Sequence, residues 1–429
     1  MLKIFDLSKD KESDILKIIQ NRDDEGTDVL NVVNNILKDI RKNADKSLNY
    51  YTKQFDKVDI DNLRVSNEEI EEAFTKVEED FINAMKLAIN NIEEYHKKQV
   101  RSGYSIEKEN GIFMGQIILP LQRIGVYVPG GTAAYPSSVA MNVIPAKVAG
   151  VEEIVMITPP SADGGINPYI LVTAKLAGVS EIYKAGGAQG IAALAYGTES
   201  IKKVDKIVGP GNIYVATAKK LVFGDVDIDM VAGPSEILIV ADENANAKYI
   251  AADLMSQAEH DKLASSILLT TSYEKYKEVV EELNKQITLL TRREIIEYSL
   301  NNYGMCVICK DIKECIKLSN KISPEHLELM VENAPDYLGQ VKNAGSIFLG
   351  YYSPEPLGDY FAGPNHVLPT NGTARFSSPL GVDSFIKKSS YLHYSKEALN
   401  SVGDKIMLLA EKEGLTAHGN SIKVRLEND

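Results

Sequence analysis

The chain has 429 residues, of which 44% are hydrophobic and 25% charged, and its formal net charge is −13. This length predicts two to four domains, and the acidic balance disfavours nucleic acid and anionic membranes as partners, because both bind basic surfaces. The first residues, MLKIFDLSKDKESD, contain no apolar run of signal-peptide length. Glycine, proline or charge interrupts the later apolar stretches, so we expect a cytoplasmic protein without a membrane span.

The first hundred residues are charged and carry hydrophobic side chains at helical spacing. The stretch SNEEIEEAFTKVEEDFINAMKLAINNIEEYHKK begins with Ser66, and Glu69 completes a capping-box signature three residues later. We expect His96, near the end of the stretch, on a solvated helix face. Residues 1–120 are therefore predicted to form a helical N-terminal region that is part of the first α/β domain.

From about residue 122, short β-branched runs alternate with alanine-rich helical segments. Strands are predicted at 124–128, 153–157, 181–185, 206–208 and 236–240. The sequences AGVEEI and AGVSEI repeat one αβ unit, in which Gly150 and Gly178 each end a helix. This alternation is typical of parallel βαβ units, and it predicts an α/β fold with doubly wound parallel sheets.

After residue 240 the same pattern continues more loosely. A helix is predicted over 245–260, and strands are predicted at 267–271, in YGMCVIC and at 346–350. The glycine- and proline-rich segment 351–382 is expected to lack regular structure, and so long a loop in a compact domain is usually functional. A helix is predicted in the C-terminal tail.

The three cysteines are Cys306, Cys309 and Cys315. Cys306 and Cys309 form a C-x-x-C, which is a motif of redox and zinc sites, but no second Cys/His pair has zinc-finger spacing. Residues three apart on a strand face opposite sides. We therefore expect core cysteines on a strand, and Cys315 on a helix.

Two glycine turns, GGAQG at 186–190 and GPGN at 209–212, each follow a predicted strand and precede a helix. A dinucleotide pyrophosphate meets helix N–H groups at such turns. Neither turn is a complete G-x-G-x-x-G, since Tyr214 stands at the third glycine position after Gly209, so ordinary tight turns remain the alternative. A third candidate turn holds Gly130 and Gly131 after a strand that ends near Tyr127.

Four residues form a candidate divalent-cation site. Gln257 and His260 are three apart on a predicted helix and can face one ion. Asp359 lies in the long loop and His418 in the tail, and two imidazoles, a carboxylate and an amide oxygen suit Zn²⁺. The sequence pattern alone does not select these four, and each histidine by itself has a structural alternative.

The stretch KISPEHLELM, residues 321–330, places Glu325 beside His326. Ser323 is a suitable N-cap and Pro324 a suitable first helical residue, which puts the pair in the first turn of a predicted helix. The helix dipole would favour an anionic glutamate and a neutral imidazole there. We therefore predict two separate bases that act on one substrate.

Many of these motifs together resemble the histidinol dehydrogenase family. The resemblance runs in order from about residue 122 to 426 through VYVPGG, YPSSVAMNVIPAKVAGV, GAQGIAALAYGT, VGPGNIYV, AGPSE, QAEHD, PEHLEL, GDYFAGPNHVLPTNGTARFSSPLG and EGLTAH. It implies oxidation of L-histidinol to L-histidine through L-histidinaldehyde, at the end of histidine biosynthesis, with two NAD⁺ and one Zn²⁺ per subunit. It also implies a homodimer with shared active sites.

The resemblance implies two incomplete Rossmann-like domains, similar to those of aldehyde dehydrogenases. Residues 121–235 would form the NAD-binding domain, 236–382 would continue the first domain with the zinc and catalytic motifs, and 383–429 would be a tail exchanged across the dimer. The implied zinc ligands are Gln257, His260, Asp359 and the His418 of the other chain. Further substrate contacts are Ser235, His326 and Glu413.

The implied NAD contacts are Tyr127, Gln189 and Asn212, while His366 is expected only to support the site. In the implied mechanism His326 relays protons in the hydride steps and Glu325 activates the water that attacks the aldehyde. From the residues alone, a zinc hydrolase or deaminase, a thiol-dependent aldehyde dehydrogenase and a non-catalytic metal-binding or interaction protein remain alternatives. The glycine turns disfavour the hydrolase, and the core cysteines disfavour the thiol enzyme.

Overall fold

The computed structural model describes residues 2–20, 26–130 and 135–427. The chain forms two compact units, the first of which combines Met1–Gln99 with Leu121–Phe385. The second combines Val100–Pro120 with Ile386–Asp429. The expected division at residues 120, 235 and 382 into functional domains stays a prediction.

The first unit contains a six-stranded sheet in which all strands are parallel. In spatial order the strands are β1 (Lys3–Asp6), β11 (Met305–Ile308), β10 (Ser265–Thr270), β9 (Glu236–Ala241), β12 (His326–Met330) and β13 (Ser346–Leu349). If the last five strands are numbered by their order along the chain, they lie side by side as 3-2-1-4-5. This is the strand order of dinucleotide-binding sheets without the sixth strand.

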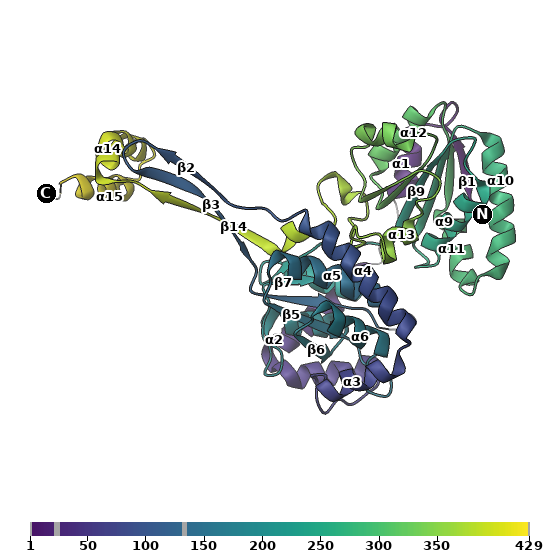
Figure 1. The fold of residues 1–429 in the computed structure, drawn as a ribbon, viewed down its shortest axis with the longest axis horizontal. Helices are drawn as coiled ribbons and strands as arrows, with labels where there is room; N and C mark the ends of the chain where they lie inside the picture. The colour runs from purple at the N-terminus through teal and green to yellow at the C-terminus, as the bar shows by residue number, and fades with distance from the viewer. Residues whose placement is uncertain (1, 21–25, 131–134, 428–429) are drawn as a thin grey trace. The chain divides into compact units, whose positions relative to one another are not determined.

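Helices cover both faces of this sheet (Figure 1). One face carries α1 (Glu12–Gln20) and α12 (Ile312–Ile322), and the other carries α9 (Ala247–Ala258), α10 (Tyr273–Gln286) and α11 (Arg293–Tyr303). A parallel sheet buried on both faces needs nearly continuous apolar strands, as in EILIVA. Cys306, Cys309 and Cys315 lie in these two cores as free thiols, which confirms their predicted packing role.

The same unit contains a five-stranded parallel sheet. Its spatial order is β6 (Glu181–Lys184), β5 (Glu153–Thr158), β4 (Arg123–Tyr127), β7 (Lys206–Val208) and β8 (Asp227–Ile228). Numbered by their order along the chain, these five strands again lie side by side as 3-2-1-4-5. The α/β fold with doubly wound parallel sheets is therefore confirmed.

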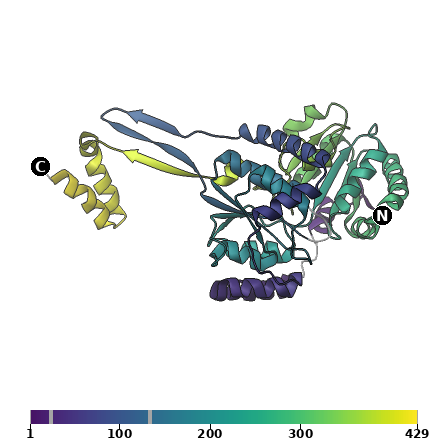
Figure 2. The same cartoon turned by 60° about the horizontal axis from the view of Figure 1, so that its bottom comes forward.

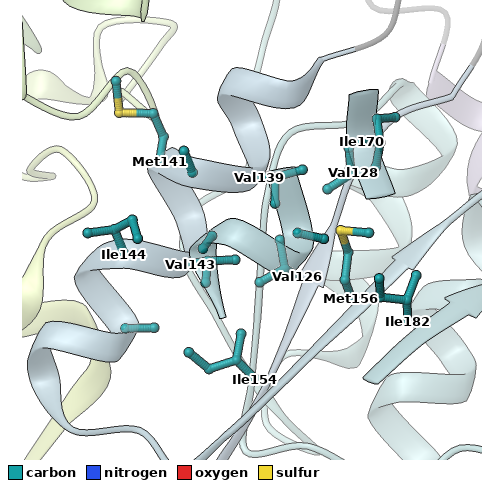
Figure 3. Close-up of a cluster of buried hydrophobic side chains, with 14 of the residues drawn as sticks. Val126, Val128, Val139, Met141, Val143, Ile144, Ile154, Met156, Ile170 and Ile182 are labelled. Carbon is teal, nitrogen blue, oxygen red and sulfur yellow. The ribbon is translucent and has the colours of Figure 1, made fainter. Parts of the chain in front are cut away.

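The five-stranded sheet also has helices on both faces. One face carries α5 (Pro136–Ala149) and α6 (Pro168–Ala177), and the other carries α7 (Gly187–Tyr196) and α8 (Ile213–Val222). Figure 3 shows part of the first core, in which Val126 of β4 and Met156 of β5 lie beside Val139 and Val143 of α5. Each such buried side chain contributes about 1.5–3 kcal/mol.

The N-terminal helices form an outer shell over this sheet. The helix α2 (Gly26–Asp56) packs on α7 and α8, while α3 (Asn67–Lys76) and α4 (Glu79–Lys97) pack on α5 and α6. The capping box of Ser66 and Glu69 is confirmed at the start of α3. The predicted solvated position of His96 is wrong, because its side chain is fully buried and its Nδ1–H donates to the Ile92 carbonyl at 2.7 Å.

Glycine ends the two repeated helices as predicted. Gly150 and Gly178 follow α5 and α6 with φ of 92° and 97°, in the left-handed region that glycine enters at no steric cost.

The segment 351–382 differs from its prediction, since it contains the short helix α13 (Glu355–Tyr360) and the 3₁₀ turn η3 (Thr373–Arg375). A second 3₁₀ turn, η4 (Val382–Phe385), begins at the last residue of the segment.

The second unit is built on a three-stranded antiparallel sheet in the order β14 (Ile386–His393), β3 (Ile112–Pro120) and β2 (Tyr104–Lys108). Two helices, α14 (Lys396–Lys412) and α15 (Thr416–Glu427), pack together at one end of this sheet (Figure 2). In the described part of the chain, no helix is both long and apolar enough to cross a membrane.

Candidate active site

Glu325 and His326 lie at the amino end of β12, not in a helix. The predicted helix start at Ser323 is wrong. Ser323 instead ends α12, with φ 58° and ψ 61° in the left-handed region, and its N–H donates to the Ser319 carbonyl at 2.8 Å. Pro324 then prevents the helix from continuing. The predicted influence of a helix dipole on Glu325 and His326 is therefore also wrong.

The sequence contained the signal for the correct interpretation. Proline is common one or two residues after a helix ends, so Ser-Pro was equally a stop signal. The run HLELM that follows is buried on both faces, as expected of a central parallel strand. Burial of a strand on both faces removes the alternating pattern that distinguishes it from a short helix.

His326 is held in one orientation by the neighbouring strand. Its Nδ1–H donates to the Glu236 carbonyl oxygen of β9 at 2.9 Å, and its side chain is 3% exposed. Burial lowers the pKa of His326, so the imidazole is neutral at pH 7. With Nδ1 protonated, Nε2 carries the lone pair, and Nε2 has no partner among the described residues. His326 therefore presents a free basic nitrogen.

Glu325 is positioned by the same strand. Its Oε2 accepts a hydrogen bond from the Glu236 backbone N–H at 2.8 Å and lies 3.6 Å from His326 Nδ1. Glu236 reciprocates, because its own carboxylate accepts from the Glu325 N–H at 3.4 Å and from the Asn371 N–H at 3.1 Å. The two carboxylates thus hold the amino ends of two adjacent strands together.

Two carboxylates from α13 face the free nitrogen of His326. Its Nε2 lies 3.8 Å from Glu355 Oε1 and 4.0 Å from Asp359 Oδ1. One ligand atom from each of the three residues fits within 4.8 Å of the others, so they form a candidate metal group. Burial, together with the neighbouring carboxyl of Asp359, raises the pKa of Glu355 to about 10, which is the response of an acid placed where a cation would be favourable.

The end of α9 approaches this group, since the Ser256 hydroxyl, beside Gln257, donates to the Glu355 carboxylate at 3.5 Å. Gln257 is in the last turn of α9, and its Oε1 is buried without a partner in the described part of the chain. His260 lies just beyond the helix, and its proximity is one of the causes that lower the pKa of His326 and of His366. The prediction that both residues lie on one helix is therefore right only for Gln257. The unpaired oxygens of Gln257 and Glu355 and the unpaired nitrogen of His326 fit a divalent cation.

A buried acidic layer behind the site was not identified from the sequence. Glu328, two residues after His326 on the same face of β12, accepts a hydrogen bond from the Glu355 backbone N–H at 2.8 Å. This contact satisfies a free N–H in the first turn of α13. Burial also raises the pKa of Glu328 well above its ordinary value and that of Asp253 on α9 to about 6. The alternation H-x-E in HLELM was the only signal for Glu328.

His366 also lies beside Asp359. Its Nδ1–H donates to the Asp359 carbonyl at 3.1 Å and lies 3.8 Å from Asp359 Oδ1, and its Nε2 lies 3.4 Å from the Ser138 hydroxyl of α5. Asn365 donates to the Met141 carbonyl at 2.6 Å. These bonds tie the long segment that carries Asp359 to a helix of the five-stranded sheet.

The three expected cofactor contacts gather at the carboxyl ends of β4, β6 and β7. The buried Tyr127 ends β4, and its hydroxyl accepts from the Gly187 N–H at 3.4 Å. Gln189 is 1% exposed near the start of α7, and its Oε1 has no partner among the described residues. Asn212 caps α8, where its Oδ1 accepts from the Tyr214 and Val215 N–H groups. Gly131 of the third candidate turn lies outside the described residues.

A buried ion pair holds the GPGN turn beside Asn212. Lys219 and Asp229 form an ion pair with side chains 2% and 1% exposed. The Lys219 ammonium also donates to the Gly209 carbonyl at 2.8 Å, and Asp229 accepts from the Gly209 N–H at 2.8 Å. Gly209 has φ 112°, and a Cβ there would lie 2.1 Å from the Tyr127 carbonyl oxygen. The turn therefore requires glycine for close approach to β4.

The remaining expected site residues are distributed over both units. Ser235 directly precedes β9, and its carbonyl accepts from the Ser265 N–H at 2.9 Å. Glu413 and His418 belong to the second unit, where Glu413 ends α14 and His418 lies in α15. Both of these side chains are exposed.

The fold and this site define an α/β enzyme that combines two doubly wound parallel sheets with a buried histidine–carboxylate group. The family model for histidinol dehydrogenase matches residues 19–426. A histidinol dehydrogenase of Clostridium acetobutylicum is 59% identical over 99% of this chain and 98% of its own, and one of Caldanaerobacter subterraneus subsp. tengcongensis is 56% identical over the whole of both chains. The chain belongs to the histidinol dehydrogenase family and is an oxidoreductase.

A solved structure supports the same assignment. The crystal structure of histidinol dehydrogenase from Elizabethkingia anophelis superposes on this chain with a TM-score of 0.94 and is 41% identical in sequence. The superposition covers 99% of this chain and 98% of the Elizabethkingia chain. The agreement therefore extends over both compact units of the chain.

Proposed function

We propose that the protein is a zinc-dependent, NAD-linked enzyme that oxidises L-histidinol to L-histidine through L-histidinaldehyde, in the final steps of histidine biosynthesis. Its relatives are named histidinol dehydrogenases. The single observation that carries the mechanism is the unpartnered Nε2 of neutral His326 beside the carboxylates of α13. The expected cytoplasmic location stays a prediction.

One Zn²⁺ per subunit would be held by Gln257, His260 and Asp359, with His418 of the partner subunit as the fourth ligand. Bound there, Zn²⁺ would fix the imidazole and amino nitrogens of the substrate. Glu355 is an additional candidate ligand, since it belongs to the group that converges on His326. We expect Ser235, Glu413 and the zinc ligands themselves to surround the substrate.

His326 is assigned the proton transfers. Its protonated Nδ1 is fixed on the Glu236 carbonyl, so Nε2 is the only ring atom that can accept the proton of the substrate hydroxyl. NAD⁺, held near Tyr127, Gln189 and Asn212, would supply the hydride acceptor for each oxidation. A buried neutral imidazole needs no prior loss of a proton at pH 7, which suits a general base.

Glu325 is assigned the activation of water. The second oxidation begins from the hydrated aldehyde, so a base must take a proton from the attacking water. The Glu325 carboxylate is oriented by the Glu236 N–H beside His326. The three cysteines are buried, and burial strongly raises the pKa of the Cys306 thiol, so a thiol-dependent route is disfavoured.

The test is NADH formation at 340 nm from L-histidinol and NAD⁺, with zinc content measured on the same preparation. We expect two NADH per histidinol, loss of activity after chelation, and recovery on adding Zn²⁺. A metal-replete, folded protein that yields no NADH would end this proposal, and recovery of a zinc-dependent hydrolysis instead would favour the hydrolase alternative.

A further inference from the structure

A cavity of about 430 Å³ lies at the carboxyl edge of β5 in the five-stranded sheet. It is lined by Thr158 and Pro159 at the end of β5, by Asn167 and Ile170 at the start of α6, and by Asp56 at the end of α2. Ligands of open α/β sheets bind outside the carboxyl ends of the strands. The cavity therefore lies at the edge where a dinucleotide would bind.

Two polar atoms of the lining residues have no partner. Oδ2 of Asp56 and Oγ1 of Thr158 are buried without a hydrogen bond from any described residue. Thr158 is 1% exposed. Neither oxygen has a donor from the described chain, so both can accept a hydrogen bond from a ligand in the cavity. Burial also raises the pKa of Asp56 to about 6, as expected for a carboxylate without a cation beside it.

The cavity adjoins the candidate cofactor contacts. The Pro159 side chain packs directly against Gly130 and Gly186. If these glycines carried a Cβ atom, it would lie 2.4 Å from Pro159 at Gly130 and 2.5 Å from it at Gly186. Gly186 leads into α7 and thus to Gln189. The charge of Asp56 also acts on the Tyr127 hydroxyl. The end of β5 is thereby packed between the turns that follow β4 and β6.

The topology gives this cavity a specific place in a dinucleotide site. β5 is the second strand of the 3-2-1-4-5 order. In sheets of this type an acidic residue about 20 residues beyond the first turn binds the 2′-hydroxyl of the adenosine ribose. Here β5 is followed by Pro159, Pro160 and Ser161, without an acid. Asp56, from a helix outside the βαβ unit, is the only acid among the described lining residues of the cavity.

Resting on the proposed NAD-linked function, we propose that Asp56 binds the adenosine-ribose 2′-hydroxyl of NAD⁺ and sets the preference for NAD⁺ over NADP⁺. The 2′-hydroxyl donates to the carboxylate, whereas a 2′-phosphate would place negative charge against it. The described lining residues include no lysine or arginine that would compensate such a phosphate. Asp56 thereby acts on cofactor choice without touching the reacting atoms.

The test measures dissociation constants of NAD⁺, 2′-deoxy-NAD⁺ and NADP⁺ by titration calorimetry at pH 7.5 on the full-length, metal-replete protein. Wild type should lose about ten- to a hundredfold in affinity when the 2′-hydroxyl is removed, as for other hydrogen bonds to a charged group. In Asp56→Ala, NAD⁺ should bind more weakly, and NAD⁺ and 2′-deoxy-NAD⁺ should bind within about threefold of each other. In Asp56→Asn the amide oxygen can still accept from the 2′-hydroxyl, so part of the difference should remain while the charge that disfavours NADP⁺ is lost.

Asp59→Asn is the matched control, because Asp59 is an exposed acid three residues away that pairs with Lys53 at 2.7 Å. It should retain the wild-type discrimination, and circular dichroism should show all variants folded. If removal of the 2′-hydroxyl weakens binding to Asp56→Ala as much as to wild type, the inference is overturned. If histidinol yields NADH while that result holds, only the role of Asp56 fails. If histidinol yields none, the proposed function fails while the binding comparison still reports on Asp56.

Discussion

Glu325 and Glu236, at the amino ends of adjacent parallel strands, bond to each other's backbone. The Glu325 carboxylate accepts from the Glu236 N–H at 2.8 Å, and the Glu236 carboxylate accepts from the Glu325 N–H at 3.4 Å. The Glu236 carbonyl also accepts from His326 Nδ1–H. One residue that the sequence did not single out therefore orients both proposed bases.

Glu325→Gln should separate the two oxidations. The amide oxygen can still accept from the Glu236 N–H, so the strand pairing survives, but an amide cannot take a proton from water. We expect alcohol oxidation within about threefold of wild type and aldehyde oxidation lower by about 10²–10⁴-fold. Stopped-flow NADH yields from histidinol and from histidinaldehyde measure this, and equal losses in both halves would contradict the assignment.

His326→Gln should impair both oxidations. The side-chain amide can replace the hydrogen bond to the Glu236 carbonyl but provides no basic nitrogen in the place of Nε2. We expect kcat to fall by about 10²–10⁴-fold for each half-reaction. The zinc content should remain that of wild type if His326 is a base rather than a ligand. Loss of zinc in this variant would instead place His326 in the metal site with Glu355 and Asp359.

The buried Lys219–Asp229 pair should matter for stability as well as for the cofactor. Lys219→Met leaves the Asp229 carboxylate buried without its cation and removes the donor to the Gly209 carbonyl. Breaking such a pair costs about 3–5 kcal/mol, which urea unfolding would measure. Lys220→Met, at the exposed neighbouring position, should cost less than about 0.5 kcal/mol. Equal midpoints for the two variants would refute the prediction.

Asp56 should give NAD⁺ binding a pH dependence near neutrality. Burial raises the pKa of Asp56 to about 6. The ionised carboxylate accepts a stronger hydrogen bond from the ribose hydroxyl than the protonated acid does. NAD⁺ affinity should therefore weaken as the pH falls through 6, and this inflection should be absent in Asp56→Asn. Titrations at pH 5.0–8.0, with Asp59→Asn as the control, measure it. A wild-type profile that the Asp56 substitution leaves unchanged would contradict this role.

The same raised pKa makes Asp56 unfavourable for folding when it is ionised. An acid whose pKa is higher in the folded state than in the unfolded state favours folding at low pH, and that contribution is lost as the pH rises through about 4 to 6. Asp56→Asn should thus stabilise the protein at pH 7.5 by about 1 kcal/mol, allowing for the part of the side chain that water reaches. Urea unfolding at pH 7.5 and pH 4.5 should show a clearly smaller gain at pH 4.5.

Subunit complementation tests the proposed sharing of active sites. Glu413 and His418 lie in a unit separate from Gln257, His260 and Asp359. If tails are exchanged, a heterodimer of Glu325→Gln and His418→Asn chains contains one site with both native residues. We expect about half of the wild-type activity per heterodimer, while each homodimer stays impaired in histidine formation. Purified, doubly tagged heterodimers without regained activity would exclude a shared site.

The sequence by itself determined the alternation of strands and helices between residues 122 and 240, the glycine-ended repeats and the core position of the cysteines. These features depend on local preference and hydrophobic period, which a short window contains. The family resemblance also selected Gln257, His260 and Asp359, residues that spacing alone did not distinguish from other polar positions.

Tertiary structure decided what local pattern could not. Whether Ser323 begins or ends a helix depends on the pairing of HLELM with β9, a contact between residues about 90 positions apart. The roles of Glu236, Glu328, Glu355 and Asp56 follow from which buried atoms face one another across strands and helices. An Asp or Glu in a sequence is ordinarily expected on the surface. Only the packing around the side chain shows whether its oxygens orient a base, cap a helix or can bind a ligand.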